Sequence, residues 1–143
     1  MNRKDKREAR VLALKVVYAN EVSNVEPESI LFYLADELNL VQSNPIIVYS
    51  QNLIKLSIDN KSQIDEIIIS HSKNWDFNRI ALIDRLILRI ELAEMLFVED
   101  IPHKVSIAEG VEIAKEYSTD DSGGFVNGIL DAVYNNIVKG KVA

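Results

Sequence analysis

Hydrophobic residues recur every three or four positions along most of the chain, a spacing that predicts helices rather than strands. In the first predicted helix, over residues 4–21, the apolar positions gather on one side; the core face holds Ala9, Leu12, Ala13, Val16, Val17 and Asn20. Pro27 and Pro45 fit the starts of the next two helices, because proline lacks an N–H that is not needed there. These helices are expected to run to about residues 38 and 59.

Later helices are predicted from capping patterns and from one long apolar stripe. Ser62 followed three residues later by Asp65 predicts the start of a fourth helix that ends near residue 72. The strongest helical pattern covers residues 77–98 and is apolar around most of its circumference. Such a helix is typically central and buried on several sides.

The last two helices follow Pro102, which breaks the long one. Ser106 and Glu109 form a predicted capping box for the sixth helix. A seventh places Phe125 and further apolar residues on one face and ends near residue 140. The pattern therefore predicts an all-α fold in which residues 1–143 form one domain of about seven helices. It also allows two small bundles that share the long helix.

Composition excludes several classes of protein. The chain has 143 residues, 48% of them hydrophobic, and no cysteine, so disulfides and thiolate zinc sites are excluded. No uninterrupted apolar run approaches the roughly 20 residues of a membrane span. Lys15 interrupts the only stretch that imitates a signal peptide. We expect a cytoplasmic protein.

Charge is distributed unevenly along the chain. The net charge is −6, yet residues 1–10 carry five basic and two acidic side chains. An acidic body with a basic start indicates a localised anion-binding site rather than a generally cationic surface.

Catalytic and metal-binding patterns are absent from the sequence. His71 and His103 fall on different predicted elements and do not have the spacing of metal ligands. Glu109, Glu112 and Glu116 recur at helical spacing and are interpreted as a solvated face. No nucleophile has an adjacent base. We therefore expect a binding protein, not an enzyme, with no metal and no cofactor.

Two stretches carry information beyond periodicity. The first helix reads Arg7-x-x-Arg10-x-x-Ala13-Leu14-x-x-x-Tyr18. Further along, Ile101-Pro102-His103-Lys104-Val105 is followed by Phe125-Val126-Asn127-Gly128-Ile129-Leu130-Asp131. Together these motifs resemble the NusB family of bacterial transcription antitermination factors, and the resemblance covers essentially the whole chain.

This resemblance implies an all-α fold of two packed three-helix bundles and a function in binding. With NusE, a small-subunit ribosomal protein, NusB proteins capture the single-stranded boxA element of ribosomal RNA leader transcripts. The pair joins the elongating RNA polymerase complex with other Nus factors. The resemblance leaves monomer and homodimer open.

The first predicted helix offers a candidate RNA surface. Arg3, Arg7 and Arg10 project within about 60° of one another, and Leu14 and Tyr18 continue the row. Guanidinium groups can contact phosphates while an aromatic ring stacks a base. With the resemblance, the predicted RNA-contacting residues are Arg3, Lys4, Lys6, Arg7, Arg10 and Tyr18. The alternative is a solvated basic terminus with Tyr18 packed at the edge of the core.

A candidate partner surface lies around the predicted last loop, where the resemblance implies that NusE docks. Asp120 and Asp121 occupy this loop, Phe125 follows, and Glu112 and Glu116 precede it. Acidic side chains would attract a basic ribosomal protein and an exposed aromatic would anchor it. Phe125 could equally belong to the core.

An alternative function also stays open. Glu8 interrupts the basic segment, and the chain is acidic overall. Both features suit a protein-interaction module of the same fold with little intrinsic RNA binding.

Overall fold

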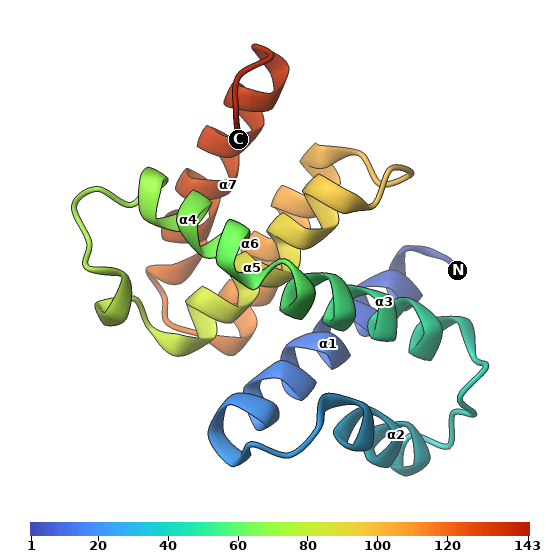
Figure 1. Cartoon of the computed structure of the whole chain (residues 1–143). Helices are drawn as coiled ribbons and strands as arrows, with labels where there is room; N and C mark the ends of the chain where they lie inside the picture. The colour runs from blue at the N-terminus through green and yellow to red at the C-terminus, as the bar shows by residue number, and fades with distance from the viewer.

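The computed structural model describes all residues, 1–143, as seven α-helices and one short 3-10 helix (Figure 1). In chain order they are α1 (Arg3–Ser23), α2 (Pro27–Glu37), α3 (Pro45–Asp59), α4 (Lys61–His71), η1 (Phe77–Arg79), α5 (Leu82–Phe97), α6 (His103–Tyr117) and α7 (Ser122–Val138). The prediction of an all-α fold with seven helices is confirmed.

The first bundle consists of α1, α2 and α3. As predicted, Pro27 and Pro45 stand at the starts of α2 and α3, and the Asn44 side chain caps α3 by accepting a hydrogen bond from the backbone N–H of Ile46 at 2.9 Å. Asn24 ends α1 in the left-handed conformation, with φ 59°. This ending turns the chain so that α2 can pack back against α1 (Figure 1).

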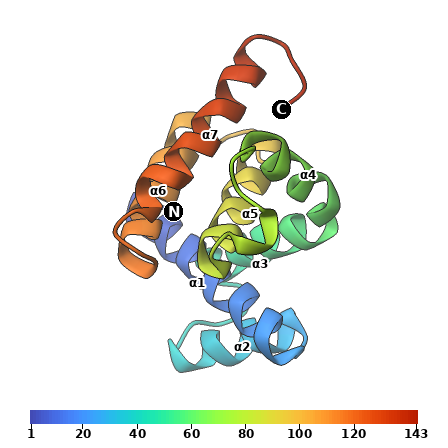
Figure 2. The same cartoon turned by 90° about the vertical axis from the view of Figure 1, so that its left-hand side faces the viewer.

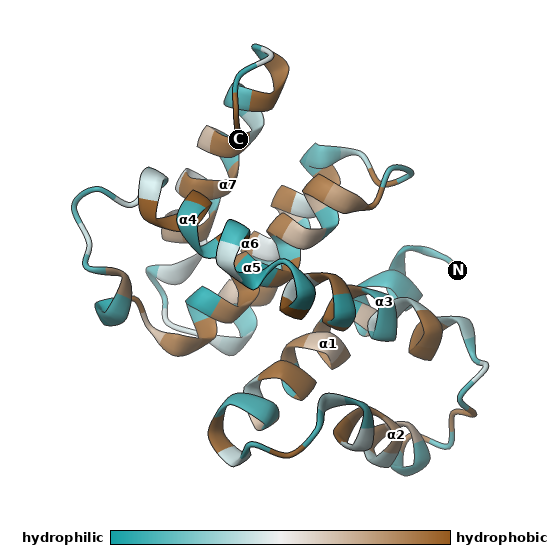
Figure 3. Cartoon of the chain, viewed as in Figure 1, coloured by the Kyte–Doolittle hydropathy of each residue, from teal (hydrophilic) through white to brown (hydrophobic).

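The second bundle is built around α5. Its residues 86–95 are all buried, because α1 and α3 pack against it as well as α4, α6 and α7. Helices α6 and α7 lie side by side in Figure 2. Teal and brown alternate along most of the outer helices in Figure 3, as expected where each helix buries one face. One core of 28 buried hydrophobic residues runs through both bundles.

The predicted helix over residues 77–98 is wrong at its N-terminal end. The chain forms η1 over the first three of these residues, and Ile80 and Ala81 are extended before α5 begins at Leu82. The Asp76 side chain stabilises η1 by accepting a hydrogen bond from the backbone N–H of Asn78 at 3.0 Å. Ile80 is nevertheless buried, so the apolar stripe continued through a segment that is not helical.

Both predicted capping boxes are also wrong. Helix α4 begins at Lys61, and Asp65 forms an ion pair with Arg89 of α5 at 2.7 Å instead of capping. Helix α6 begins directly after Pro102, so Ser106 and Glu109 lie inside the helix. Both side chains are buried, which also corrects the interpretation of Glu109 as part of a solvated face.

Candidate nucleic-acid interface

The basic residues at the start of the chain lie on an ordered helix. The Asn2 side chain caps α1 by accepting a hydrogen bond from the Asp5 backbone N–H at 2.8 Å. Arg3 and Lys4 are exposed, and Lys6 and Arg7 are half-buried. These four cations are therefore held on one turn of helix at the surface.

A groove of about 510 Å³ separates the start of α1 from the loop between α5 and α6. Arg3 and Lys6 contribute cations from α1, and Lys104 contributes one from the first turn of α6. The apolar part of the lining is Ile101, Pro102, Val105 and Ala108, and the acidic part is Asp100 and Glu109. Nothing in the sequence marks Lys104 as part of this site, because only the folded chain brings the first turn of α6 near the start of α1.

Arg10 also borders this groove, but its side chain is buried and held in ion pairs, so its role as an RNA contact stays a prediction. The side chain is 1% exposed, and its Nε donates to the two carboxylate oxygens of Glu94 at 3.1 and 2.9 Å. One Nη donates to Glu109 at 3.2 Å. Burial alone would lower the pKa of the guanidinium. The charge of Glu94 and the hydrogen bond to it outweigh burial, so the pKa is raised above its usual value. Arg10 is a structural cation that ties α1 to α5 and α6.

Glu94 is the centre of this buried cluster. Besides Arg10, it accepts hydrogen bonds from the hydroxyl of Tyr49 on α3 and from Ser106 on α6, the latter at 2.6 Å. Burial and the hydrogen bond to Glu94 raise the pKa of Tyr49. The cluster therefore connects four helices of the two bundles through one carboxylate.

Arg7 lies between the cluster and the solvent. Its Nε donates to Glu109 at 3.0 Å, its Nη2 donates to the second carboxylate oxygen, and 39% of the side chain stays exposed. The hydrogen bond to Arg7 lowers the pKa of Glu109, and the same bond raises that of Arg7. Arg7 thus reaches the surface, with one edge of its guanidinium already bound.

A second carboxylate in the cluster has no cation of its own. Glu91 is 1% exposed, and burial together with the charge of Glu94 raises its pKa well above the usual range. Its side chain packs against Gly110 of α6, where an added Cβ would lie 2.9 Å from the Glu91 Cγ. Glycine at this position therefore permits α6 to approach α5 closely.

The predicted row from Arg3 to Tyr18 is broken. Its middle members, Arg10 and Leu14, are buried. Tyr18 is 42% exposed, but it lies about 18 Å along the helix from Lys6 at 1.5 Å per residue. The structure therefore does not bring Tyr18 to the groove.

The candidate partner surface has the predicted acidic residues on its exterior. Glu112 and Glu116 are exposed on α6, and Asp120 and Asp121 are exposed in the loop that follows. Lys115 lies 3.6 Å from Glu112 and offsets part of this charge.

Phe125 is neither fully exposed nor fully buried. Its ring packs against the core and meets Trp75 edge to face, with 5.8 Å between ring centroids. Both rings line a groove of about 590 Å³ with Ile80 and Ala81 between α5 and α7. Trp75 is 59% exposed. Trp75 could not be identified from the sequence, because nothing in its segment indicates that it lies beside α7.

The loop between α6 and α7 is fixed by Asp84 on α5. One carboxylate oxygen accepts a hydrogen bond from the Ser118 hydroxyl, and the other accepts one from Ser122 at 3.0 Å. Asp84 is buried at 7% exposure. It therefore holds both ends of the loop that carries Asp120 and Asp121.

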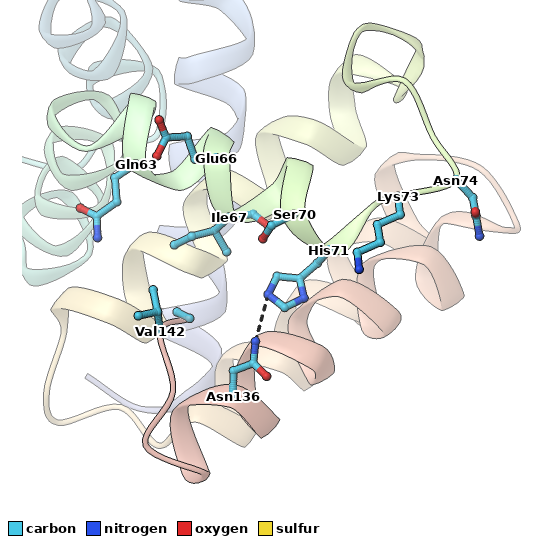
Figure 4. A pocket seen from close by; sticks show the side chains of 10 residues that line it. Gln63, Glu66, Ile67, Ser70, His71, Lys73, Asn74, Asn136 and Val142 are labelled. Carbon is cyan, nitrogen blue, oxygen red and sulfur yellow. Dashed lines mark hydrogen bonds between the residues drawn. The ribbon is translucent and has the colours of Figure 1, made fainter.

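A further cleft lies between α4, α7 and the end of the chain (Figure 4). In Figure 4 the His71 ring points toward Asn136, and the two side chains are 3.4 Å apart. Burial and the charge of Lys73 lower the pKa of His71. The lining mixes polar and apolar residues without converging charges, so it does not resemble an anion or metal site.

Residues 1–143 contain neither a membrane-spanning helix nor a cluster of metal-binding side chains. None of the helices combines the length and apolar character needed to cross a membrane. No group of three or more histidine, aspartate or glutamate side chains is placed to hold a metal ion.

Comparisons with known proteins agree on one family. Residues 7–135 match the profile of the NusB family. The transcription antitermination protein NusB of Chloroherpeton thalassium is 43% identical over 132 residues, covering 92% of this chain and 62% of that protein. The NusB protein of Natranaerobius thermophilus is 38% identical, covering 95% of this chain and 99% of the relative.

A solved structure has the same fold. The NusB chain in a crystal structure of antitermination factors NusB and NusE with double-stranded RNA superposes with a TM-score of 0.80 at 26% identity. The match covers 94% of this chain and 98% of that one.

Proposed function

Because the chain belongs to the NusB family, we propose that it is a transcription antitermination factor, acting through residues 1–143 as one RNA- and protein-binding domain. With NusE it binds boxA-type single-stranded RNA in ribosomal RNA leader transcripts. The pair then joins the elongating RNA polymerase with other Nus factors, in the cytoplasm. The role is one of binding and not of catalysis, and it requires no cofactor.

The groove beside α1 is the observation that carries the RNA part of this proposal. Arg3, Lys6 and Lys104 come from two helices and line the same depression. Lys4 is exposed on the same turn, and Arg7 is partly exposed next to it. In a chain with net charge −6, this concentration of cations is a local attraction for phosphates.

The groove between Trp75 and Phe125 supports the second part of the proposal, NusE binding. An exposed tryptophan beside a phenylalanine is a typical anchor in protein interfaces. Asp121 lines the same groove, the exposed Asp120 precedes it in the loop, and both would attract a basic ribosomal protein. Asp84 holds their loop in one conformation, which reduces the entropy lost on binding.

One observation favours the alternative, a protein-interaction module with little RNA affinity of its own. Arg10 is buried in ion pairs, and Arg7 is bound to Glu109 along one edge. Two of the five basic residues at the start of the chain are therefore partly or wholly neutralised inside the protein.

The first experiment is a titration of fluorescently labelled boxA-type RNA at two salt concentrations, with and without NusE. Four phosphate contacts by Arg3, Lys4, Lys6 and Lys104 would give a log–log salt slope of about −3 for a single strand. Arg3→Ala/Lys6→Ala should weaken binding and reduce the slope by about 1.4.

A matched control removes the same charge elsewhere. Lys55 and Lys61 are exposed on α3 and α4, so Lys55→Ala/Lys61→Ala lowers the net charge equally without touching the groove. If the two double variants bind RNA alike, the groove is not the RNA site. If NusE binds but RNA affinity stays negligible, the interaction module is the correct function.

The partner surface is tested by binding to NusE. Trp75→Ala should weaken the complex by at least tenfold, whereas Tyr33→Ala removes an equally exposed aromatic from α2 and should have no effect. Equal affinities for the two variants would place the NusE surface elsewhere.

A further inference from the structure

An aromatic cluster stands where α6 begins and α7 approaches its end. The rings of His103 and Tyr134 meet edge to face, with centroids 6.0 Å apart and an interplanar angle of 67°. The Nζ of Lys104 lies over the Tyr134 ring, 5.8 Å from its centroid. Both rings are half-buried and Lys104 is exposed, so the cluster is anchored to the protein and open on one side.

This cluster adjoins the basic groove through a shared residue. Lys104 lines the groove with Arg3 and Lys6, and it also covers the Tyr134 ring. A strand of RNA that leaves the groove past Lys104 therefore meets an aromatic surface next.

The start of α6 adds to the attraction for phosphate. Pro102 precedes the helix and offers no side-chain cap, so the N–H groups of His103 and Lys104 have no intrahelical partner. The positive end of the helix dipole lies at the same point. The first turn of α6 thus carries a cation, free amides and the His103 ring, and Tyr134 of α7 packs against that ring.

These features match what a single strand needs. Its unstacked bases can lie against aromatic side chains, whereas the bases of a duplex are stacked inside and cannot. The contact between Lys104 and the ring is a cation–π contact at an exposed site, which is weaker than stacking of a base on tyrosine. A base can therefore replace the ammonium over the ring while Lys104 turns to a phosphate.

We propose that Tyr134, beside His103 and under Lys104, is a base-stacking site for single-stranded RNA and extends the basic groove. This inference rests on the RNA binding proposed above. It assigns a role to α7, which the candidate RNA surface did not include.

The test compares two substitutions of one residue. Tyr134→Leu removes the ring but keeps an apolar side chain for the part that packs on the core, and Tyr134→Phe keeps the ring. We expect Tyr134→Leu to lower the affinity for boxA-type single-stranded RNA about 5- to 30-fold with an unchanged salt slope. Tyr134→Phe should stay within about twofold of the parent protein, and Lys104→Ala should reduce the salt slope by about 0.7.

A second measurement uses the parent protein alone. RNA carrying 4-thiouridine at successive positions is photo-crosslinked and the linked peptides are identified by mass spectrometry. One position should crosslink to Tyr134 or His103, in addition to positions that crosslink to α1. This readout stands even where Tyr134→Leu fails to fold.

The outcomes separate the two proposals. One outcome is that Arg3→Ala/Lys6→Ala weakens RNA binding, Tyr134→Leu does not, and RNA crosslinks only to α1. The proposed stacking site would then be wrong, and the groove would still be the RNA site. If the parent protein binds no RNA with or without NusE, the RNA function itself fails and the stacking site with it.

Discussion

Replacing Arg10 by methionine should destabilise the protein strongly and leave its RNA affinity nearly unchanged. Methionine keeps the length of the apolar stem but removes the cation that Glu94 and Glu109 share. Glu109 retains Arg7, whereas Glu94 is left fully buried with only the hydroxyls of Tyr49 and Ser106.

The magnitude follows from the burial of Glu94. Its side chain is 0% exposed, so its charge has no access to water once Arg10 is gone. Removing one member of a buried ion pair costs about 3–5 kcal/mol. For a chain of this size, that loss lowers the melting temperature by roughly 6–20 °C. The double variant Arg10→Met/Glu94→Gln removes the stranded charge and should recover at least half of the lost free energy.

Urea denaturation followed by circular dichroism at pH 7 measures the free energy of unfolding of both variants. RNA titrations are carried out at a temperature at which Arg10→Met is still folded. The affinity of this variant for RNA should stay within about twofold of that of the parent protein. A loss of stability below about 1 kcal/mol, combined with a tenfold loss of RNA affinity, would refute this reasoning and return Arg10 to the RNA surface.

Three further predictions concern other parts of the same packing. Because the pKa of Glu91 is raised in the folded state, the folded protein binds the extra proton, and stability should fall as pH rises above about 4.5. Denaturation at pH 4 and pH 7 should show Glu91→Gln more stable than the parent protein at pH 7, with the difference vanishing at pH 4. Gly110→Ala should cost about 1–2 kcal/mol in the free energy of unfolding, since its Cβ meets Glu91, whereas Gly124→Ala, with no neighbour within 4 Å, should gain about 0.5–1 kcal/mol. Asp84→Ala should free the loop between α6 and α7 and weaken NusE binding at least fivefold, which calorimetry can measure; unchanged affinity would show that this loop plays no part in the complex.

The helices that could be predicted are those whose signals are local. Pro27 and Pro45 mark the starts of α2 and α3 correctly, because a missing N–H acts within one turn. The start of α5 is predicted too early because Ile80 continues the apolar pattern. That pattern shows only that Ile80 faces the core, and an extended residue can face the core as well as a helical one.

The charged residues were harder to place, because their surroundings come from distant segments. Ser106 and Glu109 have the spacing of a capping box, yet that spacing also puts two polar side chains on one helix face, and here the face meets Arg10 and Glu94. The sequence did contain a sign that Arg10 is buried. The positions three, four and seven residues after it are the apolar Ala13, Leu14 and Val17, all of them buried. An arginine on such a face is expected to be paired inside the protein rather than solvated.

The functional surfaces also contain some residues that could be predicted from the sequence and some that could not. The acidic loop and the exposed basic residues of α1 could be found from the sequence, because charge density is a local property. Lys104 and Trp75 could not, since each becomes part of a groove only when helices distant in sequence pack side by side.

The bond between Arg7 and Glu109 has a consequence for how RNA would be selected. A free arginine samples many rotamers and loses that freedom when it grips a phosphate. Here Glu109 has already oriented the guanidinium plane and cancelled most of its long-range field. Arg7 is therefore expected to add little to the speed with which any polyanion is attracted. Its contribution comes at close range, by favouring only those strands whose phosphates arrive in the one orientation it presents.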